Sequence, residues 1–570
     1  MAVHSALSEK TSPVVARKPL AIERVCQAIV LLIGARCTFV ARRLPVGADS
    51  VAYLDLARAY VRHDWHTAVN GYWGPLYAWL LAITMRIFHP GILPEIAVAQ
   101  ALNFALLVVA LYTFSRFWHE VAAWSLRISD DEKTIPEAVP SLWIVVGYLL
   151  LVVNFTWNMA MINPDVLVAA IVFAIGALLF RLDHRLPDRG TDHIGVGAYV
   201  WLGLLLAVGY YAKTIMLYFA VFVLVAITIQ GFRSGSSRKP IAAVLVFAAL
   251  ISPFVLILSR SEGHFTAGDS GRLNYSWFVD GPETKTWMKE EPGSPIPFYP
   301  GPILLDSPRV FGLPSIAGVT YAPWYDATRF DTRTHPRFDW RGQLRELAIN
   351  LRYPKEQLMG AGAALIVPML LLAWYTARAS LRHFTASWFC TLPAAAIFGM
   401  YLLVHLVQRF VLGFSLVLWA AAWASICVLP GMQLLARRAM LVGIVVFSAY
   451  TLPGLLHFVI APPSESTDHD VAIAESLSHY GINAGDAVAS IGNGQEAYWA
   501  YLARVPVVAE VWSIDSARFW AAPSERQQGA LRSMANSGAK AVVWRRDSDQ
   551  MCPAQWQALP ENSGCIATLR

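Results

Sequence analysis

The chain has 570 residues, of which 56% are hydrophobic and only 15% are charged, and its mean hydropathy is +0.46. Soluble domains are typically about 45–50% apolar and about 25% charged, so this composition excludes an ordinary soluble protein. The net charge of +6 comes from basic residues scattered over loops, which excludes a basic stripe for nucleic acid.

Apolar runs recur along most of the chain and indicate the fold class. Runs of roughly 16–22 residues are long enough to cross a ~30 Å hydrocarbon layer as helices. The sequence therefore predicts a polytopic α-helical membrane protein with about 11 transmembrane helices. Residues 75–89 are also apolar, but this run is short and bounded by prolines, which favours an interfacial helix. The expected spans are about 21–40, 96–115, 140–156, 165–181, 196–212, 214–230, 240–258, 358–376, 384–404, 410–429 and 439–460.

Lysine and arginine residues gather in alternate loops, which orients the chain in the membrane. Because cytoplasmic loops carry the excess of cations, we place the N-terminus inside, and an odd number of spans then places the C-terminus outside. The first outer loop (41–95), the large outer loop (259–357) and the tail then share the extracytoplasmic face. The cation-rich inner loops contain Arg181, Arg185 and Arg189; Arg233, Arg238 and Lys239; Arg378 and Arg382; and Arg437 and Arg438.

The composition changes near residue 461, which divides the chain into two expected domains. Residues 1–460 are expected to form a transmembrane domain, and residues 461–570 a small soluble α/β domain on the outer face. In the tail, helical patterns alternate with short strand-like runs, as in an α/β layer. The helical patterns are 467–480, 494–503 and 523–537, and the strand-like runs are 487–491, 505–508 and 541–544.

Two cysteines of the tail, Cys552 and Cys565, are the only cysteines outside the apolar spans. Because we place the tail in an oxidising compartment, we expect these thiols to form a disulfide. Two free thiols are the alternative, since spacing alone does not establish the geometry. The tail also contains Gly492-Asn493-Gly494, which we interpret as a structural turn, because a dinucleotide-binding fingerprint would need further glycines.

Four ionisable residues lie at the outer ends of predicted spans, namely Asp49, Asp165, Lys213 and Arg409. Ionisable groups at membrane depth cost about 2.5–3.5 kcal/mol near the bilayer centre, which makes them candidates for function. The alternative for Lys213 and Arg409 is that their charged ends extend to lipid head groups.

Other polar residues of the first outer loop have simpler explanations. Asp55 can pair at the surface with Arg58 or Arg62, one or two turns along the same helix. His63 and His66 are interpreted as a surface cluster, because nothing indicates a further metal ligand. No Walker loop, His-Glu-x-x-His motif or Gly-x-Ser-x-Gly turn occurs in the sequence.

The large outer loop (259–357) is too long to be a passive connector. Its candidate binding residues are Asp269, Arg272, Trp324 and Tyr325. Flat aromatic rings beside carboxylates and amides suit stacking on sugar rings and hydrogen bonding to hydroxyls. The alternative is that the aromatic side chains cover the membrane-proximal surface and pack the loop on itself.

Several short motifs occur in a fixed order on the same predicted face. They are Gly-x-Asp-Ser-x-x-Tyr-x-x-x-Ala from Gly47 to Ala57, Pro75-Leu76-Tyr77, Asn163-Pro164-Asp165-Val166-Leu167, Tyr211-Ala212-Lys213-Thr214 and Gln408-Arg409-Phe410. Together they resemble the GT-C superfamily of integral-membrane glycosyltransferases, which includes protein O-mannosyltransferases and the lipid A aminoarabinose transferase. The runs 266–278 and 322–326 resemble a bacterial subgroup, which implies a bacterial inner or plasma membrane. One departure is Trp73-Gly74, where such enzymes often carry a lysine that contacts an anionic donor.

The resemblance implies transfer of a sugar from a polyprenyl-phosphate-linked donor to an acceptor hydroxyl of a lipid, glycan or protein, with inversion. Asp49 would be the general base, and Lys213 and Arg409 would hold the lipid phosphate. Asp165 would position the acceptor, the base or a divalent metal ion, and the resemblance does not decide whether a metal ion is required. Tyr53, which lies four residues after Asp49 on the same helical face, would contribute to substrate binding with the residues of the large outer loop.

Two other function classes remain open. A transporter or flippase is also polytopic with charges at membrane depth, but it usually shows hydropathy repeats and helices broken near the midplane, and neither is clear in this sequence. A ligase or polymerase of extracellular glycans also has a large outer loop, but typically has an arginine and histidine site.

Overall fold

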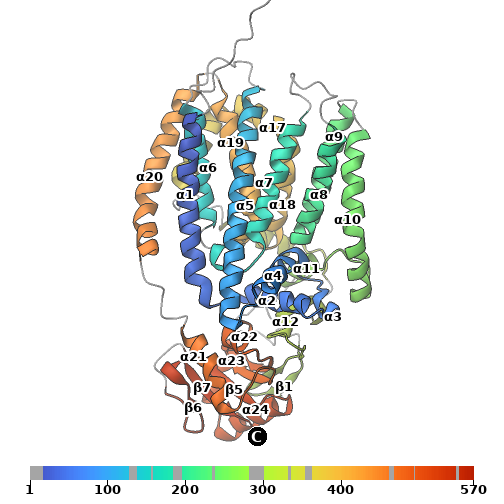
Figure 1. The fold of residues 1–570 in the computed structure, drawn as a ribbon, viewed down its shortest axis with the longest axis vertical. Coiled ribbons are helices and arrows are strands. Elements are labelled where there is room, and N and C mark those ends of the chain that lie inside the picture. The colour runs from blue at the N-terminus through green and yellow to red at the C-terminus, as the bar shows by residue number, and fades with distance from the viewer. Residues whose placement is uncertain are drawn as a thin grey trace, which may run out of the picture.

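The structure, a computed structural model, consists of a helical bundle with a small sheet-containing domain at one end (Figure 1). It describes residues 17–127, 138–155, 158–183, 195–233, 238–280, 301–330, 336–352, 362–429, 431–460, 468–492, 494–546 and 551–569. Parts of predicted spans, cation-rich loops and tail elements lie outside the described residues, among them residues 156, 185, 189, 358–361, 467 and 493.

Each of the eleven predicted spans contains a helix in the described part of the chain, which confirms the polytopic helical prediction. These helices are α1 (Arg17–Val40), α5 (Ile92–Arg127), α6 (Ala138–Phe155), α7 (Asp165–Leu182), α8 (Val196–Ala212), α9 (Ile215–Arg233), α10 (Arg238–Glu262), α16 (Ala363–Tyr375), α18 (Trp388–Val404), α19 (Gln408–Cys427) and α20 (Gln433–Ile460).

Fewer than eleven of the described helices are long and apolar enough to cross a membrane by length and composition. Among the described residues seven meet this criterion, or eight if α16 and α17 (Ala377–Ala386), which meet at 108°, form one bent span. The helices α8 and α18 have 17 residues each. At ~1.5 Å per residue they are about 26 Å long, shorter than a ~30 Å hydrocarbon layer. They are followed by Lys213 and His405, which line the cavity described below, so the short helices leave room for it.

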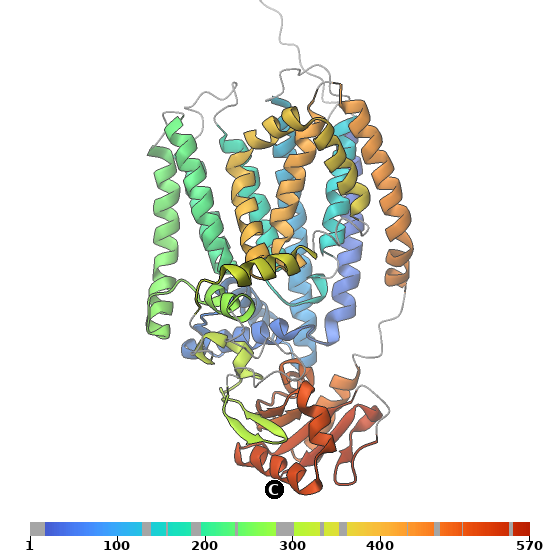
Figure 2. The ribbon, with the colours of Figure 1, turned by 180° about the vertical axis from the view of Figure 1, so that it is seen from behind.

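Short helices cover the end of the bundle that faces the tail, as the two opposite views show (Figure 1, Figure 2). They are α2 (Ala48–Val61), α3 (Trp65–Ala68) and α4 (Pro75–Phe88) from the first outer loop, and α11 (Ser270–Phe278), α12 (Ala322–Tyr325), α13 (Ala327–Phe330) and α14 (Trp340–Asn350) from the large outer loop. α1 begins at the opposite end. Both loops and the tail therefore share one end of the bundle, and the compartment that this end faces stays a prediction.

α4 has the pattern of a helix that lies along a surface. Pro75 occupies the first turn, where its missing N–H leaves no hydrogen bond unmade. Tyr77 is buried, whereas Ile83 is 54% exposed. A Cβ on Gly74 would lie 2.6 Å from the carbonyl oxygen of Ala212, so only glycine permits this approach to the end of α8. The close approach explains the glycine immediately before Pro75.

The tail is built on a mixed sheet, which in the described residues has the order β1-β2-β4-β3-β5-β7-β6. β3, β4 and β5 are parallel neighbours, and β7 pairs antiparallel with β5. The three strand-like runs of the sequence correspond to β3, β4 and β5, so those strand predictions are confirmed. The strands are β1 (Ile303–Asp306), β2 (Arg309–Gly312), β3 (Val488–Ile491), β4 (Val507–Val511), β5 (Ala541–Arg545), β6 (Gln557–Ala558) and β7 (Gly564–Thr568).

The first two strands of this sheet come from the large outer loop and not from the tail. β2 pairs antiparallel with β4, where Phe311 lies opposite Glu510. From the sequence we expected all of 259–357 to belong to the membrane domain. Strands of four residues do not indicate which distant strand they pair with. The expected boundary at residue 461 therefore does not separate two independent units, since strand pairing crosses it.

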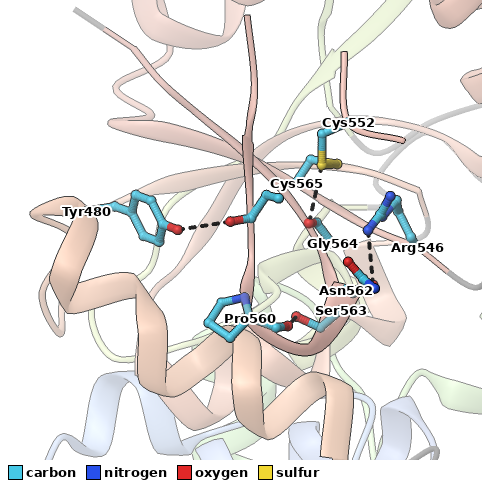
Figure 3. Close-up of a disulfide and its surroundings, with 9 residues drawn as sticks. Tyr480, Arg546, Cys552, Pro560, Asn562, Ser563, Gly564 and Cys565 are labelled. Atoms are coloured by element: carbon cyan, nitrogen blue, oxygen red, sulfur yellow. Dashed lines mark hydrogen bonds between the residues drawn. A yellow bond between two sulfur atoms is a disulfide. The ribbon is translucent and has the colours of Figure 1, made fainter. Parts of the chain in front are cut away.

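Cys552 and Cys565 form a disulfide, which confirms that prediction (Figure 3). Their Cα atoms are 5.8 Å apart, and the bridge fastens the segment before β6 to β7. Nearby, the hydroxyl of Tyr480 donates to the carbonyl of Ala558 in β6 at 3.1 Å. Both contacts fix the sheet edge that lies farthest from the β1–β2 hairpin.

A buried ion pair joins the membrane bundle to the tail. Arg58 of α2 donates to both carboxylate oxygens of Glu95 in α5, at 3.0 and 2.5 Å. The guanidinium of Arg58 also lies 4.3 Å from the ring centre of Tyr501 in α22 (Tyr498–Ala503), and Arg504 is 3.9 Å from Glu95. Removing one partner of a buried pair typically costs about 3–5 kcal/mol, so the Arg58–Glu95 pair ties α2 to α5. Tyr501 and Arg504 of the tail pack against this pair.

Candidate functional site

Asp49 lies in the first turn of α2, where the positive end of the helix dipole favours a carboxylate. Gly47 precedes the helix with a φ of +83°, a backbone conformation that glycine adopts without strain. Arg409 donates to Oδ2 of Asp49 at 2.5 Å, and the indole N–H of Trp324 donates to Oδ1 at 3.1 Å. Both carboxylate oxygens of the predicted base therefore have a partner.

Asp165 and Lys213 form a second ion pair beside the first. Asp165 begins α7, and its backbone N–H donates to the side-chain oxygen of Asn163 at 3.0 Å. Lys213 lies between α8 and α9, and its Nζ is 2.7 Å from Oδ1 of Asp165. Oδ2 of Asp165 is 3.6 Å from the guanidinium of Arg409, so Arg409 contacts both carboxylates.

The ring of Phe410 supports both cations. Its centre lies 3.8 Å from Nζ of Lys213 and 5.0 Å from the guanidinium of Arg409, distances at which an aromatic face attracts a cation. The four charged groups form a row of ion pairs in the order Asp49, Arg409, Asp165 and Lys213, with two positive and two negative charges. In such a row an incoming anion can replace one carboxylate, and each cation still has a negatively charged partner.

These charged residues line one cavity of about 460 Å³ at the end of the bundle that faces the tail. Small-molecule sites are typically about 300–1,000 Å³, so the cavity is large enough for a sugar ring and its phosphate. Tyr53 lines it too, with its ring centre 5.0 Å from that of Trp73. The lining also includes Tyr72, Gly74, Asn163, Thr214, Tyr218, Ser270, Asn274, Tyr275, Phe278, Met400, Tyr401, His405 and Phe410.

The structure brings together six of the nine site residues predicted from the sequence, and their roles stay predictions. The six are Asp49, Asp165, Lys213, Arg409, Tyr53 and Trp324.

Asp269, Arg272 and Tyr325 do not line the cavity and make contacts within the outer loops instead. Oδ1 of Asp269 accepts a hydrogen bond from the hydroxyl of Thr266 at 3.0 Å and lies 3.8 Å from Nε of Arg272. Tyr325 is buried, and its hydroxyl donates to the carbonyl of Thr67 at 2.6 Å. These contacts hold α11 and α12 in place, and both helices contribute residues that line the cavity.

Asp55 is not the surface residue that the sequence predicted. Its side chain is buried, and its Oδ2 accepts a hydrogen bond from the backbone N–H of Thr320 at 2.7 Å. Burial raises the pKa of Asp55 to about 6, although Arg58, 3.7 Å away, acts in the opposite direction. Because Thr320 belongs to the large outer loop, Asp55 fastens that loop to α2, and the local pattern around Asp55 carries no signal of so distant a partner.

His405 also lines the cavity and was not among the site residues predicted from the sequence. Its ring stacks on Phe278 of α11, with ring centres 3.8 Å apart and planes 3° from parallel. Burial, with a contribution from Arg409, lowers the pKa of His405 to about 4, so its imidazole is neutral at pH 7. The criterion that selected Arg409, an ionisable group at the outer end of a span, would also have found His405.

The described residues contain no group of three His, Cys, Asp or Glu side chains that could hold a metal ion. The carboxylates that line the cavity are Asp49 and Asp165, and cationic side chains contact both of them. Divalent cations need several oxygen ligands, so the described residues that line the cavity do not by themselves fit a divalent metal centre.

Solved structures provide a match over nearly the whole chain, whereas no protein-family model and no curated protein sequence matches it. The crystal structure of ArnT from Cupriavidus metallidurans bound to undecaprenyl phosphate aligns with 96% of this chain and 97% of ArnT, at 11% identity and a TM-score of 0.50. The chain has the ArnT fold. ArnT is a GT-C integral-membrane glycosyltransferase, so the resemblance in fold expected from the motifs is confirmed.

Structures of the Archaeoglobus fulgidus oligosaccharyltransferase also match. The apo form aligns with 91% of this chain and 69% of its own, at 11% identity and a TM-score of 0.49. AglB in complex with an inhibitory peptide and a dolichol-phosphate aligns with 94% of this chain and 70% of its own, at 12% identity and a TM-score of 0.47. At 11% identity the ArnT match establishes the fold of a multi-pass membrane protein, and the chemistry has to be argued from the site.

Proposed function

We propose that the chain is a glycosyltransferase that moves a sugar from a polyprenyl-phosphate-linked donor to an acceptor hydroxyl at the outer end of the bundle, with inversion. The observation that carries the proposal is the single cavity in which Asp49, Arg409, Asp165 and Lys213 meet. It combines a carboxylate, two cations and an aromatic wall, which are the groups that such a transfer requires. The ArnT structure, which contains undecaprenyl phosphate, supports a lipid-phosphate donor.

In this proposal Arg409 and Lys213 bind the donor phosphate. A phosphodiester between a polyprenyl chain and a sugar carries one negative charge, which guanidinium and ammonium groups hold through charge-assisted hydrogen bonds. Because Arg409 contacts Asp49, a phosphate that binds this guanidinium replaces the carboxylate as its partner. Lys213 keeps its contact with Asp165 throughout.

The exchange frees Asp49 to act as the general base. Its Oδ2 takes the proton of the acceptor hydroxyl while the hydroxyl oxygen forms a bond to the anomeric carbon. The bond between that carbon and the phosphate oxygen breaks, and its electron pair leaves with the polyprenyl phosphate, whose charge Arg409 and Lys213 stabilise. A single displacement of this kind inverts the anomeric centre.

Asp165 holds the two cations in place and does not react. It contacts Lys213 at 2.7 Å and Arg409 at 3.6 Å, so both cations remain directed at the cavity when the phosphate arrives. Tyr53 and Trp324 also line the cavity, where an aromatic wall suits packing against a sugar ring. The acceptor itself is a hydroxyl of a lipid, glycan or protein.

Purified protein in lipid nanodiscs and a panel of labelled undecaprenyl-phosphate-linked hexoses and pentoses test this proposal. Envelope lipids, glycans and hydroxyl-containing peptides serve as acceptors. We expect acceptor-dependent release of undecaprenyl phosphate, with an equal amount of glycosylated acceptor. Transfer of intact donor across a vesicle membrane without cleavage would show a flippase, and extension of a glycan on a lipid pyrophosphate would show a polymerase or ligase. Either of these results would overturn the proposal.

A further inference from the structure

A carboxylate buried in the tail fixes part of the cavity wall. Glu510 of β4 is 0% exposed, and a buried carboxylate is tolerated only with hydrogen-bond partners. Its oxygens accept hydrogen bonds from the hydroxyl of Tyr321, the indole N–H of Trp512 and the backbone N–H of Gly494, each at 2.9 Å. A Cβ on Gly494 would collide with this carboxylate. The tail therefore holds Tyr321, a residue of the large outer loop, in one position.

Tyr321 transmits this constraint to Asp49 within one turn of helix. The backbone carbonyl of Tyr321 accepts hydrogen bonds from the N–H groups of Trp324 and Tyr325 at 3.3 and 3.1 Å, and Tyr321 is the N-cap of α12. The indole of Trp324 then donates to Oδ1 of Asp49 at 3.1 Å. A continuous series of hydrogen bonds thus runs from the interior of the tail to the predicted base.

A second contact from the tail reaches α2 directly. The hydroxyl of Tyr498, the first residue of α22, accepts a hydrogen bond from the backbone N–H of Gly47 at 3.1 Å. Gly47 is the N-cap of α2 and precedes Asp49 by two residues. The start of α2 is therefore anchored to the tail independently of Trp324.

We propose that the C-terminal domain positions the general base. In this proposal, which rests on the proposed function, Glu510 holds Tyr321 so that Trp324 orients Asp49, while Tyr498 fixes the start of α2. Once Arg409 turns to the phosphate, the indole of Trp324 keeps the carboxylate directed at the acceptor. A displacement of about 1 Å can cost roughly 10²-fold in rate, so this support matters for turnover. Glu510, Tyr321 and Tyr498 are positioning residues that touch no substrate.

The test uses the full-length protein in nanodiscs, with Tyr321→Phe and Glu510→Gln as variants. Tyr480→Phe is the matched control, because it removes a tyrosine hydroxyl bond within the same domain, to Ala558. We expect Tyr321→Phe and Glu510→Gln to lower kcat roughly ten- to a hundredfold. The KM for a labelled undecaprenyl-phosphate-linked donor and the affinity for undecaprenyl phosphate should not change, because neither cation is touched. A kcat of Tyr321→Phe equal to that of the control, or a loss that appears in affinity instead, would overturn the proposal.

A double-mutant cycle distinguishes a failure of the positioning proposal from a failure of the proposed function. In an Asp49→Asn background, Tyr321→Phe should cause no further loss of turnover, because no base remains to be positioned. If Tyr321→Phe instead multiplies the loss caused by Asp49→Asn, Tyr321 acts elsewhere and the positioning proposal is wrong. If Asp49→Asn alone retains full turnover, Asp49 is not the base, and the proposed function fails first.

Discussion

Arg409 donates to Oδ2 of Asp49 at 2.5 Å, so the cation assigned to the donor phosphate is bound to the carboxylate assigned to the acceptor proton. In the proposed mechanism, a phosphate that binds Arg409 takes this cation away from Asp49, so the base is released when the leaving group is in place. The pair would then couple donor binding to activation of the base.

Replacement of Asp49 tests the base. Asp49→Asn keeps the size of the side chain and can still accept the indole N–H of Trp324, but it cannot take a proton. We expect turnover to fall by about 10²–10⁴, while undecaprenyl phosphate binding does not weaken, because Arg409 has lost its competitor. Asp64→Asn is the matched control, since Asp64 caps α3 and asparagine caps a helix equally well. Full turnover by Asp49→Asn in the labelled-donor assay would assign the base elsewhere.

Arg409→Ala and Lys213→Ala test the phosphate site. Each should weaken undecaprenyl phosphate binding roughly ten- to a hundredfold, because a lost charge-assisted hydrogen bond typically costs about 1.5–3 kcal/mol. Arg518→Ala is the control: it removes an exposed cation of the tail and should not change the affinity for undecaprenyl phosphate. Affinities can be measured by fluorescence titration in nanodiscs. If Arg409→Ala and Lys213→Ala bind undecaprenyl phosphate as tightly as wild type, the two cations only neutralise Asp49 and Asp165.

Asp326 gives the outer loops a pH-dependent stability. Burial, partly offset by a hydrogen bond from Thr328, raises the pKa of Asp326 from 3.8 to about 7. The folded state then holds the proton more tightly than the unfolded state, so this contribution to stability is present at low pH and is lost as the pH rises towards 7. The thermal midpoint should fall between pH 5 and pH 8, and Asp326→Asn should reduce that fall.

Asp486→Asn is the control for this pH dependence. Asp486 is a tail carboxylate with a lowered pKa, caused first by its hydrogen bond from Lys540, and it stays charged throughout the same range. Replacing Asp486 should not alter how the thermal midpoint changes between pH 5 and pH 8, compared with wild type. An unchanged slope in Asp326→Asn would show that Asp326 is not its source.

The orientation in the membrane can be tested with reporter fusions. Fusions after residue 235 and after residue 465 should report opposite compartments, with the second one outside. Equal signals would remove the argument that the cavity faces the extracytoplasmic side.

The disulfide should stabilise the tail without acting on the site. Replacing Cys552 and Cys565 by alanine should cost up to about 3 kcal/mol of tail stability, because a short closed loop restricts the unfolded chain. Limited proteolysis of the tail is a suitable measurement, with Cys26→Ala, which removes a free cysteine, as control. Equal proteolysis rates for the two variants would contradict the expectation, and undecaprenyl phosphate binding should be unaffected in both.

The parts of the fold that depend on local sequence were predictable. Apolar runs predicted the helices. Because successive spans run in opposite directions, alternate loops share one face, and this predicted that Asp49, Asp165, Lys213 and Arg409 would lie at one end of the bundle. Their convergence on one cavity agrees with that reasoning. The helix α8 (Val196–Ala212) has the bounds that the apolar run predicted, and at 17 residues it is only slightly shorter than the helices counted as long enough to cross a membrane.

Contacts between distant segments were not predictable from one sequence. The spacing of Asp55 and Arg58 is the same whether their helix is exposed or covered, so nothing local indicated that Thr320 buries Asp55. Asp269 and Arg272 were selected by their chemistry, but the fold directs them to each other and to Thr266. His405 was predictable as an ionisable group at the end of a span, but its stacking on Phe278 of the distant outer loop was not.

The pairing of β2 with β4 has a consequence for how the protein is made. The β1–β2 hairpin is synthesised long before its partner strand, which follows the last membrane helix. Until β4 has been synthesised and has paired with β2, the hairpin exposes an unpaired edge, and such edges invite wrong pairing. Chains that terminate before β4 are therefore expected to be recognised as unfinished and degraded, so that only fully translated protein acquires a complete site.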